Sequence, residues 1–319
     1  MIKTEKTTAY LQIHIAVLLF GVTAILGKLI VFDGLALVWH RMWISVIGLV
    51  LLPGVVRGIR NMPRKDFLRF AGIGVIVSLH WLTFYGSIKL GDSASIPLAC
   101  LATSTIFTSF LEPLITKSKF QAIESLLGVL VVFGILLILN VGAAYHLAIG
   151  VGLLSAFLAA LFSVLNKQYM GNHRTLSITS IELFSGFVFL SIVILVYEGG
   201  FNLENYSLFR DDLISKHAVA GYYIHSFWYL LILGILCTSV AYALSLYALK
   251  ILSAFTTNLA INLEPIYGML MAVVLFQEND QLTPSFYWGS ALILCSVILH
   301  PFLMKITDKR VKAKIIREA

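Results

Sequence analysis

Residues 125–166 read SLLGVLVVFGILLILNVGAAYHLAIGVGLLSAFLAALFSVLN and contain no Asp, Glu, Lys or Arg. A run of about 18 or more uncharged, mostly apolar residues predicts a transmembrane helix, and this run is long enough for two such helices. The alternating pattern of a membrane β-barrel is absent, so helices are the expected spanning elements. Charge-free runs of similar character occur at 7–27, 70–88, 93–111, 217–249 and 281–304.

The composition of the whole chain agrees with a protein built almost entirely from membrane helices. Of its 319 residues, 59% are hydrophobic and only 12% are charged, whereas soluble domains average about 25% charged residues. Too little polar sequence remains to cover a large soluble domain, which excludes a soluble enzyme and a nucleic-acid binder. We predict an all-α integral membrane protein with ten transmembrane helices, at 11–31, 35–53, 69–88, 94–116, 120–140, 146–167, 176–197, 227–249, 254–276 and 284–304.

The distribution of basic residues predicts the orientation of these helices, because cytoplasmic loops are enriched in Lys and Arg. If the N-terminus lies in the cytoplasm, 18 of the 23 Lys and Arg residues fall on the cytoplasmic side. We therefore predict a multi-pass protein of the cell (inner) membrane with both termini cytoplasmic. The basic residues that fall elsewhere are Lys28, Arg41, Lys89, Arg210 and Lys216.

No motif for a metal, a nucleotide or a covalent intermediate is present. Cys100, Cys237 and Cys295 are odd in number and fall inside predicted helices, which argues against a disulfide framework. The chain contains no CxxC, HExxH, GxxxxGK[ST] or GxSxG motif. We therefore expect no cofactor, no metal site and no ATP-driven pump, and we do not predict an enzyme.

The two halves of the chain are related by a weak internal repeat. Residues 72–139 align without a gap on 233–300 at an offset of 161, which pairs Lys89 with Lys250. The first two predicted helices match the sixth and seventh at an offset of 139, so an insertion of 22 residues precedes the eighth. Each half then holds five helices, and an odd number inverts the second half in the membrane. Inverted repeats with a substrate site near the midplane are typical of secondary transporters.

This repeat defines the predicted organisation of the chain. A cytoplasmic N-terminus at 1–10 precedes the first five-helix repeat at 11–140. The second repeat occupies 141–304 and carries an extracytoplasmic insertion at 198–226. A basic cytoplasmic tail follows at 305–319, where its positive charge would face anionic lipid.

Short motifs around the ninth predicted helix resemble those of a known transporter family. Leu263-Glu264-Pro265 lies within this helix, Phe276-Gln277-Glu278 lies at its end, and Gly289 follows eleven residues later. With the order of ten short helices over roughly 11–304, these motifs resemble the EamA-like family of the drug/metabolite transporter superfamily. The resemblance implies export of amino acids or other small metabolites across the bacterial inner membrane, or transport of drugs or sugars.

The first half departs from the motifs of the second. At the offset of 161, Thr103-Ser104 stands where Glu264-Pro265 stands, and Lys117 stands where Glu278 stands. The two halves have therefore diverged, so the motif residues of the second half have no direct counterparts in the first.

Ionisable side chains inside membrane helices are functional candidates, since each costs about 2.5–3.5 kcal/mol at the bilayer centre. Glu264 lies near the middle of the ninth helix, where Pro265 removes a backbone donor and frees a carbonyl one turn back. Glu264 either binds a coupling proton or is held by a donor from a facing helix. Glu182 in the seventh helix and His80 in the third are further ion-coupling candidates, with hydrogen-bonded packing as the alternative for His80.

Aromatic side chains predict where a substrate would bind. Trp81 and Tyr85 lie one turn apart on the third helix, and the offset of 161 places Trp81 on Tyr242 of the eighth. Such a pair would flank the substrate and close it off on either side. The alternative is an interfacial aromatic belt, to which we assign Trp228 at the start of the eighth helix.

Polar side chains complete the predicted substrate site. Asn258 and Asn262 are four residues apart on one face of the ninth helix, and their alternative role is hydrogen bonding between helices. Arg41, near the outer end of the second helix, would bind a substrate carboxylate or else snorkel to the surface. Glu112, near the cytoplasmic end of the fourth helix, either carries a proton or reaches the interface, and we favour the interface.

The function these features favour is secondary active transport, most simply export, of small metabolites such as amino acids by alternating access. The alternatives are an uncoupled facilitator, a drug or sugar carrier of the same fold, an intramembrane enzyme that uses Glu264 and His80 on a lipid, and a non-transporting scaffold. The expected partners are a small-molecule substrate, the lipid bilayer and protons as the coupling ion, but no nucleic acid. The sequence leaves the substrate unnamed and a homodimer open.

Overall fold

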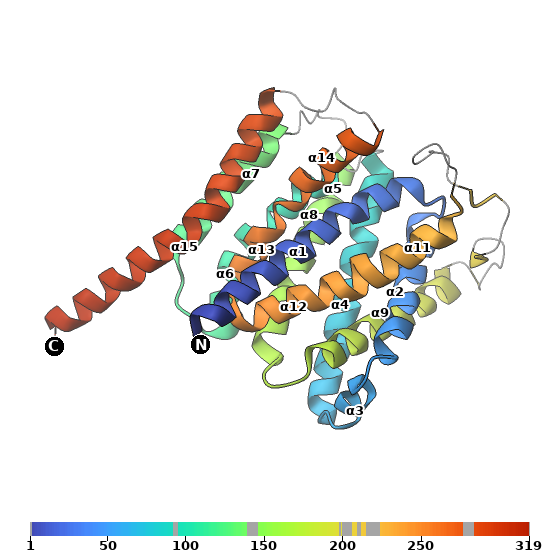
Figure 1. Cartoon of the computed structure of the whole chain (residues 1–319), viewed down its shortest axis with the longest axis horizontal. Coiled ribbons are helices and arrows are strands. Elements are labelled where there is room, and N and C mark those ends of the chain that lie inside the picture. The colour runs from blue at the N-terminus through green and yellow to red at the C-terminus, as the bar shows by residue number, and fades with distance from the viewer. Residues whose placement is uncertain are drawn as a thin grey trace.

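In the computed structural model, the described residues form helices and, apart from these, one isolated β-bridge between Ile214 and His225 (Figure 1). The structure describes residues 2–91, 95–138, 146–197, 199, 206–208, 212–214, 224–276 and 284–318. The helices are α1 (Ile2–Leu29), α2 (Gly34–Val50), α3 (Val55–Arg60), α4 (Arg64–Gly91), α5 (Ser95–Ala102), α6 (Ser104–Thr116), α7 (Ala122–Ile138), α8 (His146–Tyr169), α9 (Thr175–Tyr197), α11 (Ser226–Gly234), the π-helix η2 (Ile235–Val240), α12 (Ala241–Ile251), α13 (Ala254–Ile261), α14 (Glu264–Phe276) and α15 (Pro284–Glu318).

Six helical segments of the described chain are long and apolar enough to cross a membrane. They are Thr4–Gly27, Arg64–Ile88, His146–Tyr169, Thr175–Tyr197, Ser226–Ile251 and Tyr287–Met304. Shorter apolar helices occupy Gly34–Val50, Cys100–Thr116 and Ala122–Leu137. The chain is therefore a multi-pass, all-helical membrane protein. Each of the ten ranges predicted from the sequence contains helix, but the ranges 94–116, 227–249 and 254–276 each hold more than one element.

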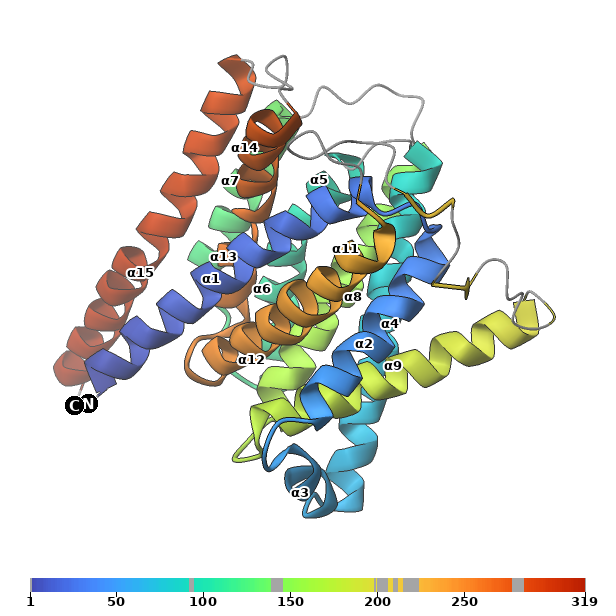
Figure 2. The ribbon, with the colours of Figure 1, turned by 45° about the vertical axis from the view of Figure 1, so that its right-hand side comes forward.

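The helices form one bundle with a two-helix layer at its edge. Helix α4 packs against α8 and α9, and α1 packs against α12 and α14. Helices α7 and α15 lie side by side along one edge (Figures 1 and 2). Both termini lie at the same end of the bundle, which we call the terminal end (Figure 2). Helix α15 runs through the predicted tail as far as Glu318.

Two of the predicted spans are interrupted by a short turn. Thr103 separates α5 from α6, and its N–H donates to the carbonyl of Cys100 at 2.9 Å. Between α13 and α14, the N–H of Leu263 donates to the carbonyl of Ala260 at 3.1 Å. Both bonds reach back three residues, as in a 3₁₀ turn. The offset of 161 places these two breaks within a residue of each other, so the internal repeat extends to this detail of the backbone.

Local chemistry accounts for both breaks. Pro265 is the second residue of α14, where a missing N–H leaves no backbone bond unmade. The hydroxyl of Thr103 donates to the carbonyl of Cys100 at 2.6 Å, which offers that carbonyl an alternative to a continuous helix.

A π-helical turn, η2, lies between α11 and α12. The hydroxyls of Thr238 and Ser239 donate five residues back, to Leu233 O at 2.7 Å and to Gly234 O at 3.0 Å. Ser45 of α2 also donates to Gly234 O, at 2.7 Å. The turn is therefore fixed against α2. Such turns are frequent at functional sites.

The close approach of α4 and α9 depends on one glycine. A Cβ added to Gly74 would lie 2.1 Å from both the carbonyl oxygen of Glu182 and the hydroxyl of Ser185. Small residues let membrane helices approach at the backbone, so Gly74 sets the spacing of this pair. Gly72, two residues earlier, has nothing within 4 Å of such a Cβ.

Candidate functional site

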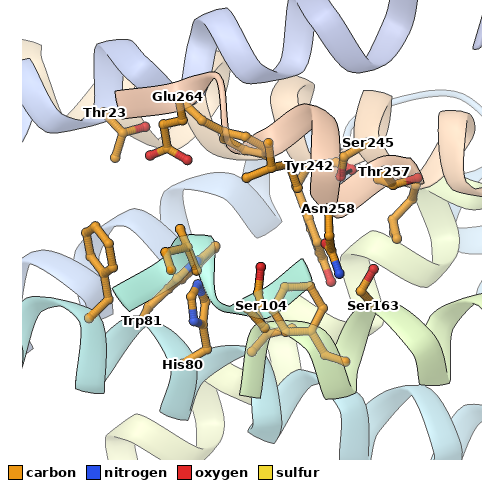
Figure 3. A pocket seen from close by; sticks show the side chains of 18 of the residues that line it. Thr23, His80, Trp81, Ser104, Ser163, Tyr242, Ser245, Thr257, Asn258 and Glu264 are labelled. Atoms are coloured by element: carbon orange, nitrogen blue, oxygen red, sulfur yellow. Dashed lines mark hydrogen bonds between the residues drawn. The ribbon is translucent and has the colours of Figure 1, made fainter. Parts of the chain in front are cut away.

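A cavity in the middle of the bundle is lined by helices from both halves of the chain (Figure 3). It contains about 920 Å³ of space between atoms, counting the part that opens to solvent. Both helix breaks border it, through Ser104 at the start of α6 and Glu264 at the start of α14. The predicted site residues that line it are Arg41, His80, Trp81, Tyr85, Tyr242, Asn258 and Glu264.

Arg41 is held in a fixed orientation at this cavity. Its Nε and Nη2 donate to the hydroxyl of Thr238 at 3.1 and 2.9 Å, and its Nη1 donates to the hydroxyl of Tyr85 at 3.2 Å. The guanidinium lies 4.1 Å from the centre of the Trp81 ring, as in a cation–π contact. Arg41 is only 3% exposed, so it does not snorkel to the surface. Of its five N–H donors, these bonds use three and leave two.

Glu264 is the acidic group of the same cavity. Its side chain is 9% exposed and points into the cavity from the first residue of α14 (Figure 3). Within the described part of the chain, no side chain donates a hydrogen bond to it, so the facing donor considered from the sequence is not found there. Arg41 is the charged group that acts on Glu264 electrostatically. The N-terminus of α14 also favours a negative charge at this position.

His80 and Asn258 each combine a place in the cavity wall with a bond to a neighbouring helix. The Nδ1 atom of His80 lies 2.9 Å from both the carbonyl oxygen and the hydroxyl of Ser155 on α8. The side-chain amide of Asn258 donates to the hydroxyl of Thr108 on α6 at 2.7 Å. Both side chains therefore connect helices, whatever they contribute to a ligand.

Tyr242 connects the cavity with a polar cluster behind it. Its hydroxyl donates to Glu182 Oε2 at 2.6 Å and accepts from the side-chain amide of Asn166 at 3.4 Å. Glu182 does not line the cavity and is fully buried. Its Oε1 atom and Asn166 Oδ1 have no hydrogen-bond partner among the described residues.

Asn262 is the other predicted site residue that does not line the cavity. Helix α13 ends at Ile261, and Asn262 is its C-cap, with an N–H that donates to Leu259 O at 3.3 Å. Its side chain is buried, and its Nδ2 has no partner within the described ranges. The roles predicted for Asn262 and Glu182 stay predictions.

Sequence reasoning missed several residues of the cavity wall. Short hydroxyl side chains contribute from helices of both halves, and Phe162 adds a ring from α8. Only Ser104 had a sequence signal, because it aligns with Pro265 at the offset of 161. The hydroxyl-bearing residues not predicted are Thr23, Ser104, Ser163, Ser245 and Thr257.

Glu112 is only 8% exposed, and its carboxylate binds the backbone of another helix and is not free in solvent. Its two carboxylate oxygens accept from the N–H groups of Ala254 and Phe255, at 2.9 and 2.8 Å. Lys167 of α8 donates to three carbonyls at the end of α12, those of Leu249 at 2.8 Å, Lys250 at 3.2 Å and Leu252 at 2.7 Å. A carboxylate and an ammonium thus hold the two sides of the α12–α13 turn, next to the cavity.

One comparison with known proteins identifies a family, and a second supports the fold. The model of the EamA-like transporter family matches residues 7–140 and, a second time, residues 146–300. Twenty-seven chains of solved structures match. One of them, described only as a protein crystal structure, superimposes with a TM-score of 0.72 at 13% identity, over 94% of this chain and 99% of that chain. At this identity the likeness shows the fold alone. No curated protein matches.

Proposed function

Because the chain belongs to the EamA-like transporter family, we propose that it is a secondary active exporter of small metabolites such as amino acids. In this proposal, ten transmembrane helices form two inverted repeats, 11–140 and 141–304, in the cell membrane. Alternating access arises as the repeats rock about the central cavity. The observation that carries the proposal is this cavity, which is lined from both halves and holds Arg41 and Glu264 together.

The pattern of broken helices supports ten crossings. If α5 with α6, α13 with α14, and α11 with η2 and α12 each form one crossing, the described helices apart from the short α3 make ten. The connection between α2 and α4 lies at the same end of the bundle as the connection between α8 and α9. Arg174 donates to Pro53 O at 2.8 Å, and His173 Nε2 lies 3.1 Å from Asp66 Oδ2 at the start of α4. The positive-inside rule then places the terminal end in the cytoplasm.

The chemistry of the cavity favours a zwitterionic substrate. Arg41 has two N–H donors left for a carboxylate, and its other bonds fix the direction in which it presents them. Glu264 offers a carboxylate without a hydrogen-bonded partner of its own among the described residues, which suits a substrate ammonium. The rings of Trp81, Phe84 and Phe162 supply an apolar wall between and around these groups.

Glu264 also provides a route to proton coupling. A carboxylate that binds either a proton or a substrate ammonium, but not both, exchanges one for the other across the membrane. That exchange is antiport, and it would drive export with the inward proton gradient. His80 is a weaker candidate for this role because its Nδ1 is engaged with Ser155.

Transport by purified protein in vesicles tests the proposal. Glu264→Gln keeps the shape of the side chain but cannot carry a charge. We expect it to fold, to lose pH-gradient-driven accumulation of labelled amino acids, and to retain exchange between the two sides. Glu5→Gln, at an exposed position of α1, is the matched control and should transport like the parent.

Each other outcome points to a different function. Gradient-driven transport by Glu264→Gln at the parent rate would contradict the coupling role. Flux by the parent that ignores the gradient would favour an uncoupled facilitator. Flux of drugs or sugars but not of amino acids would keep the fold and change the cargo. No flux of any probe would favour the enzyme or scaffold alternatives.

A further inference from the structure

Behind the cavity, three side chains from three helices form a buried polar cluster. Tyr242 of α12 donates to Glu182 Oε2 of α9 at 2.6 Å, and Asn166 of α8 donates to the Tyr242 hydroxyl at 3.4 Å. Glu182 and Asn166 are both 0% exposed, and Tyr242 is 4% exposed. Two acceptors, Glu182 Oε1 and Asn166 Oδ1, have no partner among the described residues. The cluster is therefore short of hydrogen-bond donors.

No described cation compensates Glu182. Helix α9 packs against α2, α3, α4 and α12, and the only titratable side chain of these that contacts the carboxyl group is Tyr242. The acidic Asp66 of α4 is itself paired with Arg69 and His173. Most described basic groups of the neighbouring helices are exposed or bound elsewhere: Arg57, Arg60, Arg64 and Lys65 at the surface, Arg41 by Thr238 and Tyr85, His80 by Ser155, Lys250 by His173 O, and Lys167 by the end of α12. His40 of α2 is buried, accepts from Trp43 through Nδ1 and has no described partner at Nε2, but no hydrogen bond joins it to Glu182.

The ionised form of Glu182 would therefore be unstable in this environment. A carboxylate presents about four acceptor sites, whereas here only the Tyr242 hydroxyl and the nearby Asn166 amide serve it and Oε1 has no partner among the described residues. A buried charge without a counter-ion or a set of donors costs several kcal/mol, and such a group neutralises instead. A bound proton removes the charge and supplies an O–H donor to a cluster that lacks donors.

We propose that Glu182, Tyr242 and Asn166 form a second proton-binding site, outside the substrate cavity and connected to it through the Tyr242 hydroxyl. The proton resides on Glu182. Tyr242 is the connecting group because it is the one member of the cluster that also lines the cavity.

The connection gives this site a defined effect on substrate binding, and this step rests on the proposed function. Tyr242 has one O–H donor, which serves either Glu182 or an acceptor atom in the cavity. A charge-assisted bond to ionised Glu182 is about twice as strong as one to the neutral acid. Proton binding at Glu182 therefore frees Tyr242 for a substrate acceptor, and by linkage a bound acceptor favours the proton. The difference in bond strength corresponds to about a fivefold change in affinity.

Infrared spectroscopy of the purified protein tests the site without any substrate. A protonated carboxylic acid has a C=O stretching band that the ionised form lacks. We expect the parent to show such a band at neutral pH that is absent in Glu182→Gln and present in Glu264→Gln. In Tyr242→Phe the band should remain but move, because the C=O group loses its donor. Tyr229→Phe is the matched control, since Tyr229 is buried but its hydroxyl has no partner in the described chain, and it should not move the band.

The proposal is overturned if Glu182→Gln leaves every protonated-carboxyl band in place, or if Tyr242→Phe leaves the Glu182 band unmoved. The transport assay then tests the coupling with the amino acid that the vesicles accumulate. Lowering the pH from alkaline values, where Glu182 is ionised, to neutral pH should raise substrate affinity about fivefold. This component should disappear in both Glu182→Gln and Tyr242→Phe and persist in Glu264→Gln. Presence of the infrared band without any flux would retain the proton site and reject the transport function. Flux without the infrared band would retain the transport function and reject the proton site.

Discussion

Removal of the Glu112 carboxylate should destabilise the α12–α13 turn more than any surface substitution. The first three residues of α13 have N–H groups with no partner inside the helix. Glu112 accepts from those of Ala254 and Phe255, and Ser253 Oγ accepts from that of Thr256 at 3.0 Å. Glu112 lies on α6, 142 positions away from Ala254 in the sequence. Its loss therefore frees two buried donors and removes a contact between two parts of the chain.

The size of the effect follows from these two bonds. Hydrogen bonds to a charged group contribute about 1.5–3 kcal/mol each, so Glu112→Ala should lower the free energy of unfolding by roughly 3–6 kcal/mol. Glu112→Gln keeps one acceptor oxygen but turns an N–H donor toward the second backbone N–H. It should therefore lose at least one bond, about 1.5–3 kcal/mol. At roughly 2 °C per kcal/mol for a chain of this size, the Ala variant should unfold at least about 6 °C below the parent.

Thermal unfolding in detergent, followed by tryptophan fluorescence, measures this difference. Glu5→Ala is the control, because Glu5 is an exposed glutamate of α1, and its midpoint should stay within about 1 °C of the parent. Midpoints for Glu112→Ala and Glu5→Ala that agree within error would refute the inference that Glu112 holds α13. A larger loss for Glu112→Gln than for Glu112→Ala would refute the account by counting acceptors.

Three further predictions concern packing, the cavity and topology. Gly74→Ala should lower the free energy of unfolding by several kcal/mol or prevent folding, because its Cβ would lie 2.1 Å from the α9 backbone. Gly72→Ala, whose Cβ would have nothing within 4 Å, should unfold within a few degrees of the parent. Equal unfolding midpoints for the two variants would contradict the close approach of α4 and α9. Trp81→Ala or Tyr242→Ala should reduce transport in vesicles at least tenfold. Trp228 is 58% exposed, and Trp228→Ala should reduce transport much less. Equal losses of transport in the three variants would assign all three side chains to membrane anchoring. Reporter fusions at Lys119 and after Ala319 should read cytoplasmic, and a fusion within 198–226 should read extracytoplasmic; the reverse pattern would reject the inverted repeat.

The class of the fold could be predicted because it depends on composition along the chain. Runs without charge, such as 125–166, fix helices by the requirement that lipid imposes on every backbone group. The interruptions of those helices were harder to predict. Pro265 signals the break before α14, but Thr103 and the π-helical turn at Ile235–Val240 depend on hydroxyl groups whose bonding partners only the folded backbone determines.

The sequence could predict those residues of the candidate site that are charged although their helices are otherwise apolar. Arg41 and Glu264 are charged residues within apolar sequence, and the structure brings both to one cavity. Glu112 is equally anomalous, yet its binding partners are backbone N–H groups in a distant helix, and a sequence does not mark such partners. Asn262 is a different case, since it lies at the C-terminal end of α13 and outside the cavity wall, and its predicted role stays untested.

The two ends of the proposed carrier differ in chemistry although they share an architecture. At the terminal end, Lys167 and Glu112 bind opposite sides of the α12–α13 turn. The offset of 139 places Lys28 at the position equivalent to Lys167, so the other half keeps a basic residue there. The offset of 161 places Val273 at the position equivalent to Glu112, so the other half has no carboxylate at that position. Under an inverted repeat, Lys28 and Val273 would lie toward the opposite membrane surface from Lys167 and Glu112. If alternating access breaks the bonds that Glu112 and Lys167 make to the α12–α13 turn, the conformation that contains them gains their free energy relative to the one that does not.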